Sequence, residues 1–400
     1  MRVARAGRYS YSRFLPLLSL ASLLVGCTDS GPAATAPRIG AEEATVSLDR
    51  SDSRTRYVSP SGTDVGSCTQ SSPCRTINYA VAQANAGDAI SVARGVYHES
   101  VKVTKRLALV GHDATIDAAG QLSPPNAVVI SGEGSAGTQL AGFTIRNAGL
   151  EGVFVDKTSR ITIDRNVVVN NDAFGPGDPL CINQPDDCGE AVHLQSVTNS
   201  VVRDNLVQNN VGGILLTDED GPTFGNLIVG NRVLDNTKDC GITLASHHFN
   251  PAQAAPPSVA GIYRNLVLHN VSNGNGAAGI GVFAGPPGAA AWENTVADNV
   301  ARNNGEGGVM IHSHTPHQYV DKNVIINNEI AENGPDADNP FADKPTGISV
   351  FSAVVPIPHT VIAANRISDE YYGIVTTNAV KVSGLRSNKF KRVVVPISQH

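Results

Sequence analysis

The chain has 400 residues, of which 41% are hydrophobic and 16% charged, and its formal net charge at pH 7 is −6. A net negative charge disfavours nucleic acid as a partner, because Lys and Arg supply the main contacts to the phosphate backbone. The same charge weakens the case for a strongly anionic substrate.

The first 26 residues have the pattern of an export signal. Four arginines and no acidic residue precede an apolar run from Phe14 to Leu24, which is too short to span a membrane stably. The residues that follow, up to Cys27, resemble a lipobox. The resemblance implies that residues 1–26 are removed, that Cys27 is lipidated, and that loss of the four arginines changes the formal charge from −6 to −10. The alternative is an ordinary signal followed by a chance cysteine.

Residues 27–56 and 57–400 differ in composition. The shorter segment is rich in Ala, Ser, Thr, Pro and Asp and has no apolar periodicity, as expected of a flexible tether. The longer segment is large for one conventional core, yet it contains no second linker. An elongated repeat domain over residues 57–400 explains both observations.

Five cysteines remain after Cys27. Two pairs are close enough in sequence to close small disulfide loops in an oxidising compartment: Cys68 with Cys74, and Cys181 with Cys188. Cys240 is left over. It lies inside a repeat, so we expect a buried small hydrophobic residue, with a reactive thiol as the alternative.

A short helix is predicted after Thr76, which can cap its N-terminus. The helix ends near Gly87 and has one apolar face, formed by Ile77, Ala80, Val81 and Ala84. A repeat domain needs such a cap because its open end exposes unpaired strand edges and core.

Eight segments repeat one motif along the chain. They are EGVFV, EAVHL, GGILL, CGITL, AGIGV, GGVMI, TGISV and YGIVT, which begin at Glu151, Glu190, Gly212, Cys240, Ala278, Gly307, Thr346 and Tyr372. Apolar residues two apart, such as Ile214 and Leu216, show the alternation of a strand with one buried face. The intervening side chains are expected to point outward.

A second motif, of two asparagines five positions apart, falls between these strands. The pairs are Asn166/Asn171, Asn205/Asn210, Asn231/Asn236, Asn299/Asn304 and Asn328/Asn333, and Asn270/Asn275 and Asn365 continue the motif imperfectly. Asparagine tolerates the left-handed backbone of a tight corner, and stacked amides can hydrogen-bond between successive turns. We interpret this motif as structural.

The two motifs predict an all-β fold, a parallel β-helix solenoid with a short N-terminal capping helix. Equivalent strands of successive coils would form parallel sheets around an interior of Val, Ile and Leu. No α-helical crossover pattern separates the strands, which argues against a doubly wound sheet.

Three segments near the start of the domain, YVSPSGTD, CRTINYAVAQANAGDAISVARGVYHESV and KRLALVGHDATIDAAG, resemble the cap and first coils of secreted pectate-lyase-like proteins. The resemblance covers residues 57–400 and implies a right-handed β-helix. It says little about activity, because such proteins include polysaccharide lyases, glycosidases, uronate epimerases, periplasmic copper-protein maturation factors and surface proteins.

The outward strand positions form two columns, where a solenoid places its functional side chains. The first column is Phe154, His193, Leu215, Thr243, Gly281, Met310 and Ser349. The second is Gln195, Thr217, Ala245, Phe283, His312 and Phe351. We expect substrate to contact Gln195, Thr217, Phe283, His312 and Phe351. The aromatic rings would stack on sugars or, alternatively, pack under loops.

Carboxylates and histidines gather between residues 186 and 248. They could supply the general acid and base that glycosidic cleavage or proton abstraction requires. The candidate catalytic residues are Glu190, His193, Asp187, Asp218, Asp239 and His247. Glu190 and His193 are the first choice, because His193 projects from a strand that Glu190 borders. The alternative is a surface histidine beside a carboxylate at the end of a loop.

A divalent cation such as calcium is the candidate cofactor. Its expected ligands are Asp218, Glu219 and Asp220 in the loop TDEDGPT, which could equally be a solvated turn. The segment HSHTPH, with His312, His314 and His317, also suggests metal. Histidine spacings of two and three residues in a loop nevertheless define no fixed tetrahedron.

Two family signatures are incomplete. Asp186-Asp187-Cys188 resembles part of a polygalacturonase signature, but the NTDG, GHG and RIK elements of that family are missing. Uronate lyases of this superfamily commonly use Lys or Arg in the groove, whereas the candidate strands carry neither. No catalytic assignment is therefore transferred from either family.

We expect an extracytoplasmic carbohydrate-active protein that binds, and cleaves or epimerises, a polysaccharide or envelope glycan. One alternative is a non-catalytic glycan-binding or scaffold lipoprotein. Another is a periplasmic metal-binding protein that holds copper or zinc through His247, His248, His312 or His314. We expect a monomer in the cell envelope, bound to the membrane only through its lipid. Thr28 resembles the outer-membrane sorting pattern of organisms with two membranes.

Overall fold

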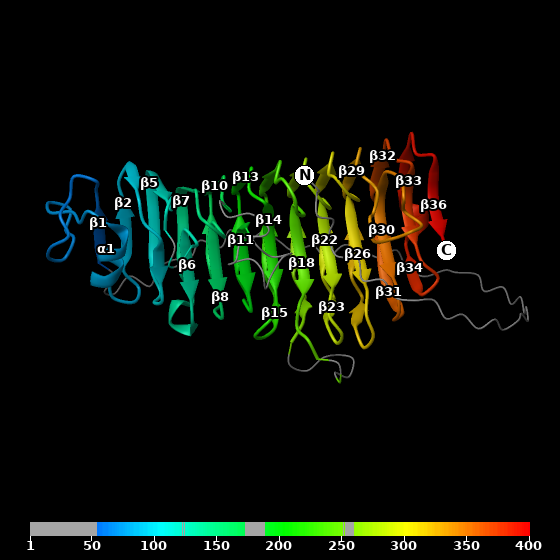
Figure 1. Ribbon diagram of the computed structural model, residues 1–400, viewed down its shortest axis with the longest axis horizontal. Helices are drawn as coiled ribbons and strands as arrows, with labels where there is room; N and C mark the ends of the chain where they lie inside the picture. Colours follow the sequence, from blue (N-terminus) through cyan, green and yellow to red (C-terminus); the bar gives the residue numbers. More distant parts are fainter. Residues whose placement is uncertain (1–53, 122, 124, 173–188, 251, 253–259) are drawn as a thin grey trace, which may run out of the picture. The chain divides into compact units, whose positions relative to one another are not determined.

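The computed structural model describes residues 54–121, 123, 125–172, 189–250, 252 and 260–400. The export signal, Cys27, most of the tether, Asp187 and the Cys181/Cys188 pair lie outside these residues. Three parallel sheets form the described domain, and its coils stack side by side from the N-terminal to the C-terminal end (Figure 1). The predicted right-handed parallel β-helix is confirmed.

The eleven-stranded sheet carries the candidate site. Its strands are β4 (Val101–Val103), β6 (Val128–Ser131), β8 (Val153–Asp156), β11 (Glu190–Gln195), β14 (Gly212–Thr217), β18 (Ile242–Ser246), β22 (Ile280–Ala284), β26 (Val309–Ser313), β30 (Thr346–Ser352), β33 (Tyr372–Thr376) and β36 (Val395–Gln399).

The 21-stranded sheet forms other sides of the coils. Its strands are β1 (Thr55–Val58), β2 (Ala89–Val92), β3 (Gly95–Tyr97), β5 (Ala108–Asp117), β7 (Gln139–Arg146), β9 (Thr162–Asp164), β10 (Val167–Val169), β12 (Val201–Arg203), β13 (Leu206–Gln208), β16 (Leu227–Val229), β17 (Arg232–Leu234), β20 (Leu266–Leu268), β21 (Val271–Asn273), β24 (Thr295–Ala297), β25 (Val300–Arg302), β28 (Val324–Ile326), β29 (Glu329–Ala331), β31 (Ile357–Ala363), β32 (Arg366–Ser368), β34 (Val380–Ser383) and β35 (Lys389–Lys391). The four-stranded sheet contains β15 (Thr223–Phe224), β19 (Ile262–Tyr263), β23 (Ala290–Trp292) and β27 (Tyr319–Asp321).

The register of the eleven-stranded sheet follows the repeats. Ile214 pairs with Ile242, which pairs with Ile280, and all three side chains are buried in the core. Alternate residues such as Leu215 therefore point away from the interior. The sequence period of two thus determines which side chains fill the coil and which face outward.

The asparagine motif forms hydrogen-bonded columns, as predicted. The Oδ1 of Asn270, for example, accepts from the backbone N and the Nδ2 of Asn231, at 2.9 and 3.0 Å. A third column, which the sequence analysis missed, runs through Asn226, Asn265, Asn294 and Asn323.

The expected left-handed backbone is found at the residue before each asparagine rather than at the asparagine itself. His269, which precedes Asn270, has φ 55°, and Asp298, which precedes Asn299, has φ 57°. The corner residue makes the turn, so the asparagine that follows can direct its amide inward to the next coil.

The N-terminal end is closed as expected. Helix α1 (Ile77–Gln83) begins after Thr76, whose side chain accepts from the backbone N of Tyr79, and it buries Ile77, Ala80 and Val81. The helix ends before Ala84, earlier than predicted, and is the only α-helix among the described residues. None of the helical structure within the described part is long and apolar enough to cross a membrane.

The Cys68–Cys74 disulfide is confirmed. Cys240 is a free, buried thiol, as expected, and burial raises its pKa well above the ordinary value. A buried thiol with a raised pKa has little thiolate, which argues for a packing role.

Two short 3₁₀ turns, η1 (Glu133–Ser135) and η2 (Leu385–Ser387), complete the regular structure described.

Candidate functional site

The two predicted outward columns exist. His193 pairs with Phe154 on one side and Leu215 on the other, and His312 lies between Phe283 and Phe351. The expectation that these positions line an open face is wrong for much of the sheet, because His193 and His312 are 2% and 1% exposed. Part of the outer face packs into its own apolar cluster, which contains Cys240, Ala278 and Met310 with Phe283 against them.

Glu151, Glu190 and His193 form a buried group that we call the His193 cluster. Each contributes one carboxylate oxygen or ring nitrogen, and these atoms all lie within 4.8 Å of one another. The Nδ1 of His193 is 3.5 Å from the Oε1 of Glu151. Its Nε2 is 2.8 Å from the Oγ1 of Thr217 on the next strand. The structure thus brings the first-choice pair together and adds Glu151.

Asp218, Glu219 and Asp220 direct their carboxylates to different partners. Asp218 is buried and accepts from the Oγ of Ser246, at 2.9 Å, and from two backbone N–H groups after it. Burial outweighs these hydrogen bonds and raises the pKa of Asp218 to about 6. Glu219 pairs with the Nδ1 of His247 at 3.0 Å.

Asp220 pairs with Lys157 at 2.7 Å and accepts from Gln195 at 3.2 Å. The three carboxylates thus contact separate partners, as in a turn that is stabilised by its own hydrogen bonds and ion pairs. Calcium binding in this loop stays a prediction. Asp239 and Glu190 both lie close to Gly212, because a Cβ at Gly212 would be 3.3 Å from the Cβ of Asp239 and 3.1 Å from the Oε1 of Glu190. The Oδ1 of Asp239 accepts from the backbone N of Cys240 at 2.6 Å.

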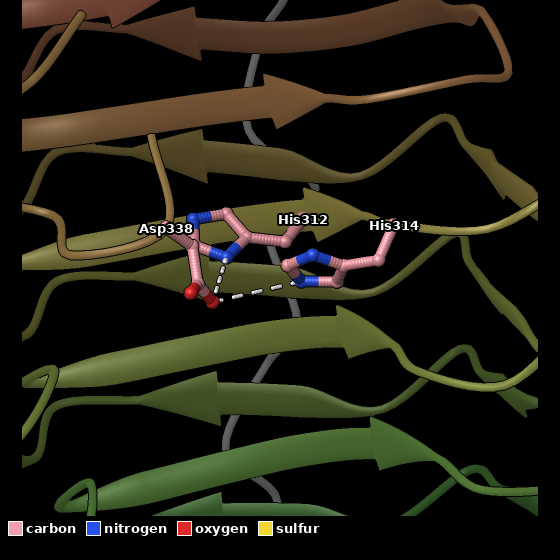
Figure 2. A group of neighbouring side chains, drawn as sticks. All are labelled: His312, His314 and Asp338. Carbon is pink, nitrogen blue, oxygen red and sulfur yellow. Dashed lines mark ion pairs between the residues drawn. The ribbon is translucent and has the colours of Figure 1, made fainter. Parts of the chain in front are cut away.

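A second group lies farther along the sheet and combines His312 and His314 with Asp336 and Asp338. We call these four residues the His312 cluster. His312 lies on β26, His314 follows that strand, and the two aspartates lie in the turn between β29 and β30. Figure 2 shows that His312, His314 and Asp338 point toward one another.

The His312 ring lies between two carboxylates, one at hydrogen-bond distance and one farther away. Its Nε2 is 2.9 Å from the Oδ2 of Asp336, while its Nδ1 is 3.8 Å from the Oδ2 of Asp338. The Nε2 of His314 is 3.9 Å from the same Asp338 oxygen. Asp338 and His314 are 62% and 31% exposed, so solvent reaches the cluster on that side.

Opposite pKa shifts mark the two histidines. Burial by itself lowers the pKa of His312, but the carboxylates of Asp336 and Asp338 outweigh it and raise that pKa to about 9. Burial and the neighbouring His312 lower the pKa of His314 to about 4. Burial, with Asp336 and Asp338, raises the pKa of Glu306 to about 7.

Gln318 organises the loop that carries His314. Its Oε1 accepts from the backbone N of His314 at 2.7 Å and from the Oγ of Ser313 at 2.8 Å. Its Nε2 donates to the carbonyls of Ala284 and Gly285 on the preceding coil. The buried amide therefore anchors His314 to the solenoid.

The donor atoms of the His312 cluster fit a transition-metal ion. Two imidazoles and one carboxylate are common ligands of Zn²⁺ and Cu²⁺. Ligands about 2.1 Å from a tetrahedral ion lie roughly 3.4 Å apart. The Asp338 oxygen lies 3.8 and 3.9 Å from the two ring nitrogens, close to that spacing, and all three ligand atoms lie within 4.8 Å of one another. Asp336 supplies the carboxylate that commonly orients a metal-binding histidine through its other nitrogen.

Sequence reasoning identified His312 and His314 but missed Asp336 and Asp338. These two aspartates lie in a turn outside the repeated segments, so the sequence did not indicate that they lie close to His312. Glu151 was missed although a signal existed, because Glu151 and Glu190 begin equivalent repeats and must lie on adjacent coils.

Fold and site together define a right-handed parallel β-helix protein with two histidine–carboxylate clusters on one sheet. The chain belongs to the family described as right handed beta helix region, whose model matches residues 126–325. Residues 254–398 also match the model of the periplasmic copper-binding protein (NosD) family. No curated protein matches the chain.

Several solved structures are similar to this chain. An alginate lyase from Paenibacillus sp. str. FPU-7 is 15% identical over 87% of this chain and 98% of its own, with a TM-score of 0.47. Pectate lyase Pel9A is 15% identical over 86% and 80%, with a TM-score of 0.49. The A-module of the Azotobacter vinelandii mannuronan C-5 epimerase AlgE4 is 13% identical over 77% and 88%, with a TM-score of 0.48. Likeness at this level does not identify an activity.

Proposed function

We propose that the protein is an extracytoplasmic metal-binding β-helix protein that holds a divalent transition-metal ion at the His312 cluster. The observation that carries this proposal is the convergence of His312, His314 and Asp338 within 4.8 Å. The Nδ1 of His312, the Nε2 of His314 and a carboxylate oxygen of Asp338 would be the ligands. The partial match to a copper-binding family supports Cu²⁺ as the first ion to test.

The location is part of the proposal. A disulfide between Cys68 and Cys74 is typical of an oxidising compartment outside the cytoplasm. The export pattern of residues 1–26 and the lipobox-like residues before Cys27 support a lipid anchor at the end of a tether. The domain would then work at a membrane surface without spanning it.

Metal titration of the purified protein tests the ligand set. We expect a Cu²⁺ ion whose electron paramagnetic resonance spectrum shows two nitrogen ligands, and whose affinity falls at least tenfold in His314→Ala and Asp338→Asn. His359→Ala is the matched control, because His359 is largely exposed and pairs with Asp321 on another sheet. Unchanged Cu²⁺ binding in both cluster variants would refute the proposal.

A second candidate function is carbohydrate binding, with cleavage or epimerisation of a glycan on the same sheet. It is favoured by the rings of Phe283 and Phe351, whose centroids lie 5.1 and 5.7 Å from that of His312. Aromatic rings bind sugar faces, and neighbouring histidines with pKa values pushed apart suit acid and base roles. The carboxylates and His193 near residues 186–248 remain candidates for the chemistry.

A panel of neutral and uronic-acid polysaccharides tests this second function. Reducing ends report hydrolysis, and absorbance of unsaturated products reports elimination. The Glu190→Ala/His193→Ala double variant and a His312→Ala variant separate the two clusters. Glycan binding without product in the wild type would favour a binding module. If the wild type neither bound a glycan nor released product, the carbohydrate function would be refuted.

A further inference from the structure

We propose that Glu151, Glu190 and His193 form a second divalent-cation site, inside the body of the domain and separate from the His312 cluster. Their ligand atoms converge within 4.8 Å. Glu151 precedes β8, and Glu190 and His193 lie on β11, the next strand of the sheet. Stacking of two coils therefore assembles the site.

The cluster buries two carboxyl groups beside one imidazole. Glu151, Glu190 and His193 are 6%, 2% and 2% exposed. The carboxyl groups of Glu219 and Asp156 also lie within electrostatic range of His193, and each has a basic neighbour of its own, His247 and Lys157 respectively. Buried charge must be compensated, and a divalent ion compensates two carboxylates at once.

Outer contacts already orient the ligand atoms. The Nε2 of His193 is held at 2.8 Å by Thr217, which directs Nδ1 toward Glu151. Asn126 donates from its Nδ2 to the Oε2 of Glu151, so the Oε1 of that carboxylate faces His193. Partners of this kind fix the tautomer and direction of metal ligands.

A glycine leaves room for the remaining ligand. A Cβ at Gly212, the residue that pairs with Glu190 on β14, would lie 3.1 Å from the Oε1 of Glu190. That distance is tighter than ordinary van der Waals contact. Gly212 therefore lets the Glu190 carboxylate keep its position beside the next strand.

The ligand set indicates the kind of ion. Two carboxylates and one imidazole are harder donors than the two imidazoles and one carboxylate of the His312 cluster. We therefore assign Mn²⁺ or Zn²⁺ to the His193 cluster, whereas Cu²⁺ is the first choice for the other site. The inference stands independently of the metal site proposed at the His312 cluster, because the two clusters share no residue.

Mn²⁺ binding to the chelator-treated full chain tests this site, with bound Mn²⁺ followed by electron paramagnetic resonance and stability by thermal unfolding. We expect one Mn²⁺ per chain, a rise in Tm, and at least tenfold weaker binding in Glu151→Gln and Glu190→Gln. Zn²⁺ should compete for the same site. His314→Ala is the control, and it should leave Mn²⁺ binding unchanged while it weakens Cu²⁺ binding.

Thr217→Val keeps all three ligands and removes only the contact to Nε2. A ten- to hundredfold loss of Mn²⁺ affinity in this variant would support the site, even if a glutamine variant failed to fold. Absence of saturable Mn²⁺ binding in the wild type, and of saturable Zn²⁺ binding in His314→Ala, would overturn the inference. Loss of Mn²⁺ binding in His314→Ala alone would also overturn it.

Discussion

Glu370→Gln should stabilise the protein at alkaline pH. Glu370 occupies the position that continues an asparagine column, where its Oε1 accepts from the backbone N and the Nδ2 of Asn333, both at 3.0 Å. The side chain is 3% exposed, and its Oε2 has no hydrogen-bond partner among the described residues. Burial outweighs the two hydrogen bonds and raises the pKa of Glu370 to about 7 from 4.5.

The sign of the pH dependence follows from this shift. A carboxyl whose pKa is raised by folding binds its proton more tightly in the folded state, so stability is lost as pH rises from about 4.5 through 7. The shift corresponds to about 3 kcal/mol at pH 8. Glutamine keeps the accepting oxygen without the charge, so Glu370→Gln should recover up to that amount at pH 8 and almost none at pH 4.5.

Urea unfolding at pH 4.5 and pH 8 measures the difference. Glu133→Gln is the control, because Glu133 is exposed and should change stability by less than about 0.5 kcal/mol at either pH. If Glu370→Gln gave the same stability change at both pH values, or destabilised the protein at pH 8, the carboxyl would not be carrying a burial penalty.

Other substitutions test the packing and the site. Asn270→Ala removes buried hydrogen-bonding groups that link three coils, so it should lower the free energy of unfolding in urea by at least about 3 kcal/mol. Gln208→Ala, which loses an exposed hydrogen bond, should lower it by less than about 0.5 kcal/mol. Similar losses in the two variants would contradict a stabilising role for the asparagine columns. Gln318→Ala should weaken Cu²⁺ binding about tenfold by calorimetry, because the histidine loop loses its anchor. Replacing the Cys68–Cys74 pair by serines should lower stability by about 2 kcal/mol, the entropy of a loop this short, and an unchanged Tm would argue against that loop constraint.

The site residues that lie within the repeated segments could be placed from the sequence. Phe283, His312 and Phe351 occupy equivalent positions of consecutive repeats, so their adjacency follows from coil stacking alone. The same logic could have placed Glu151 beside Glu190. The burial of these columns was not predictable, because it depends on how residues such as Phe283 and Met310 pack over the outer face.

The amino-acid sequence by itself determined the parallel β-helix, its register, the capping helix and the asparagine columns. These features repeat, and a period-two pattern stacked coil on coil places each position directly beside its equivalent. Only the tertiary structure brought Asp336 and Asp338 to His312. They lie in a turn outside the repeat, where Asp336 accepts from the backbone N of Asp338 and Asn339, and local hydrogen bonds of this kind determine the position of a carboxylate that no periodicity encodes.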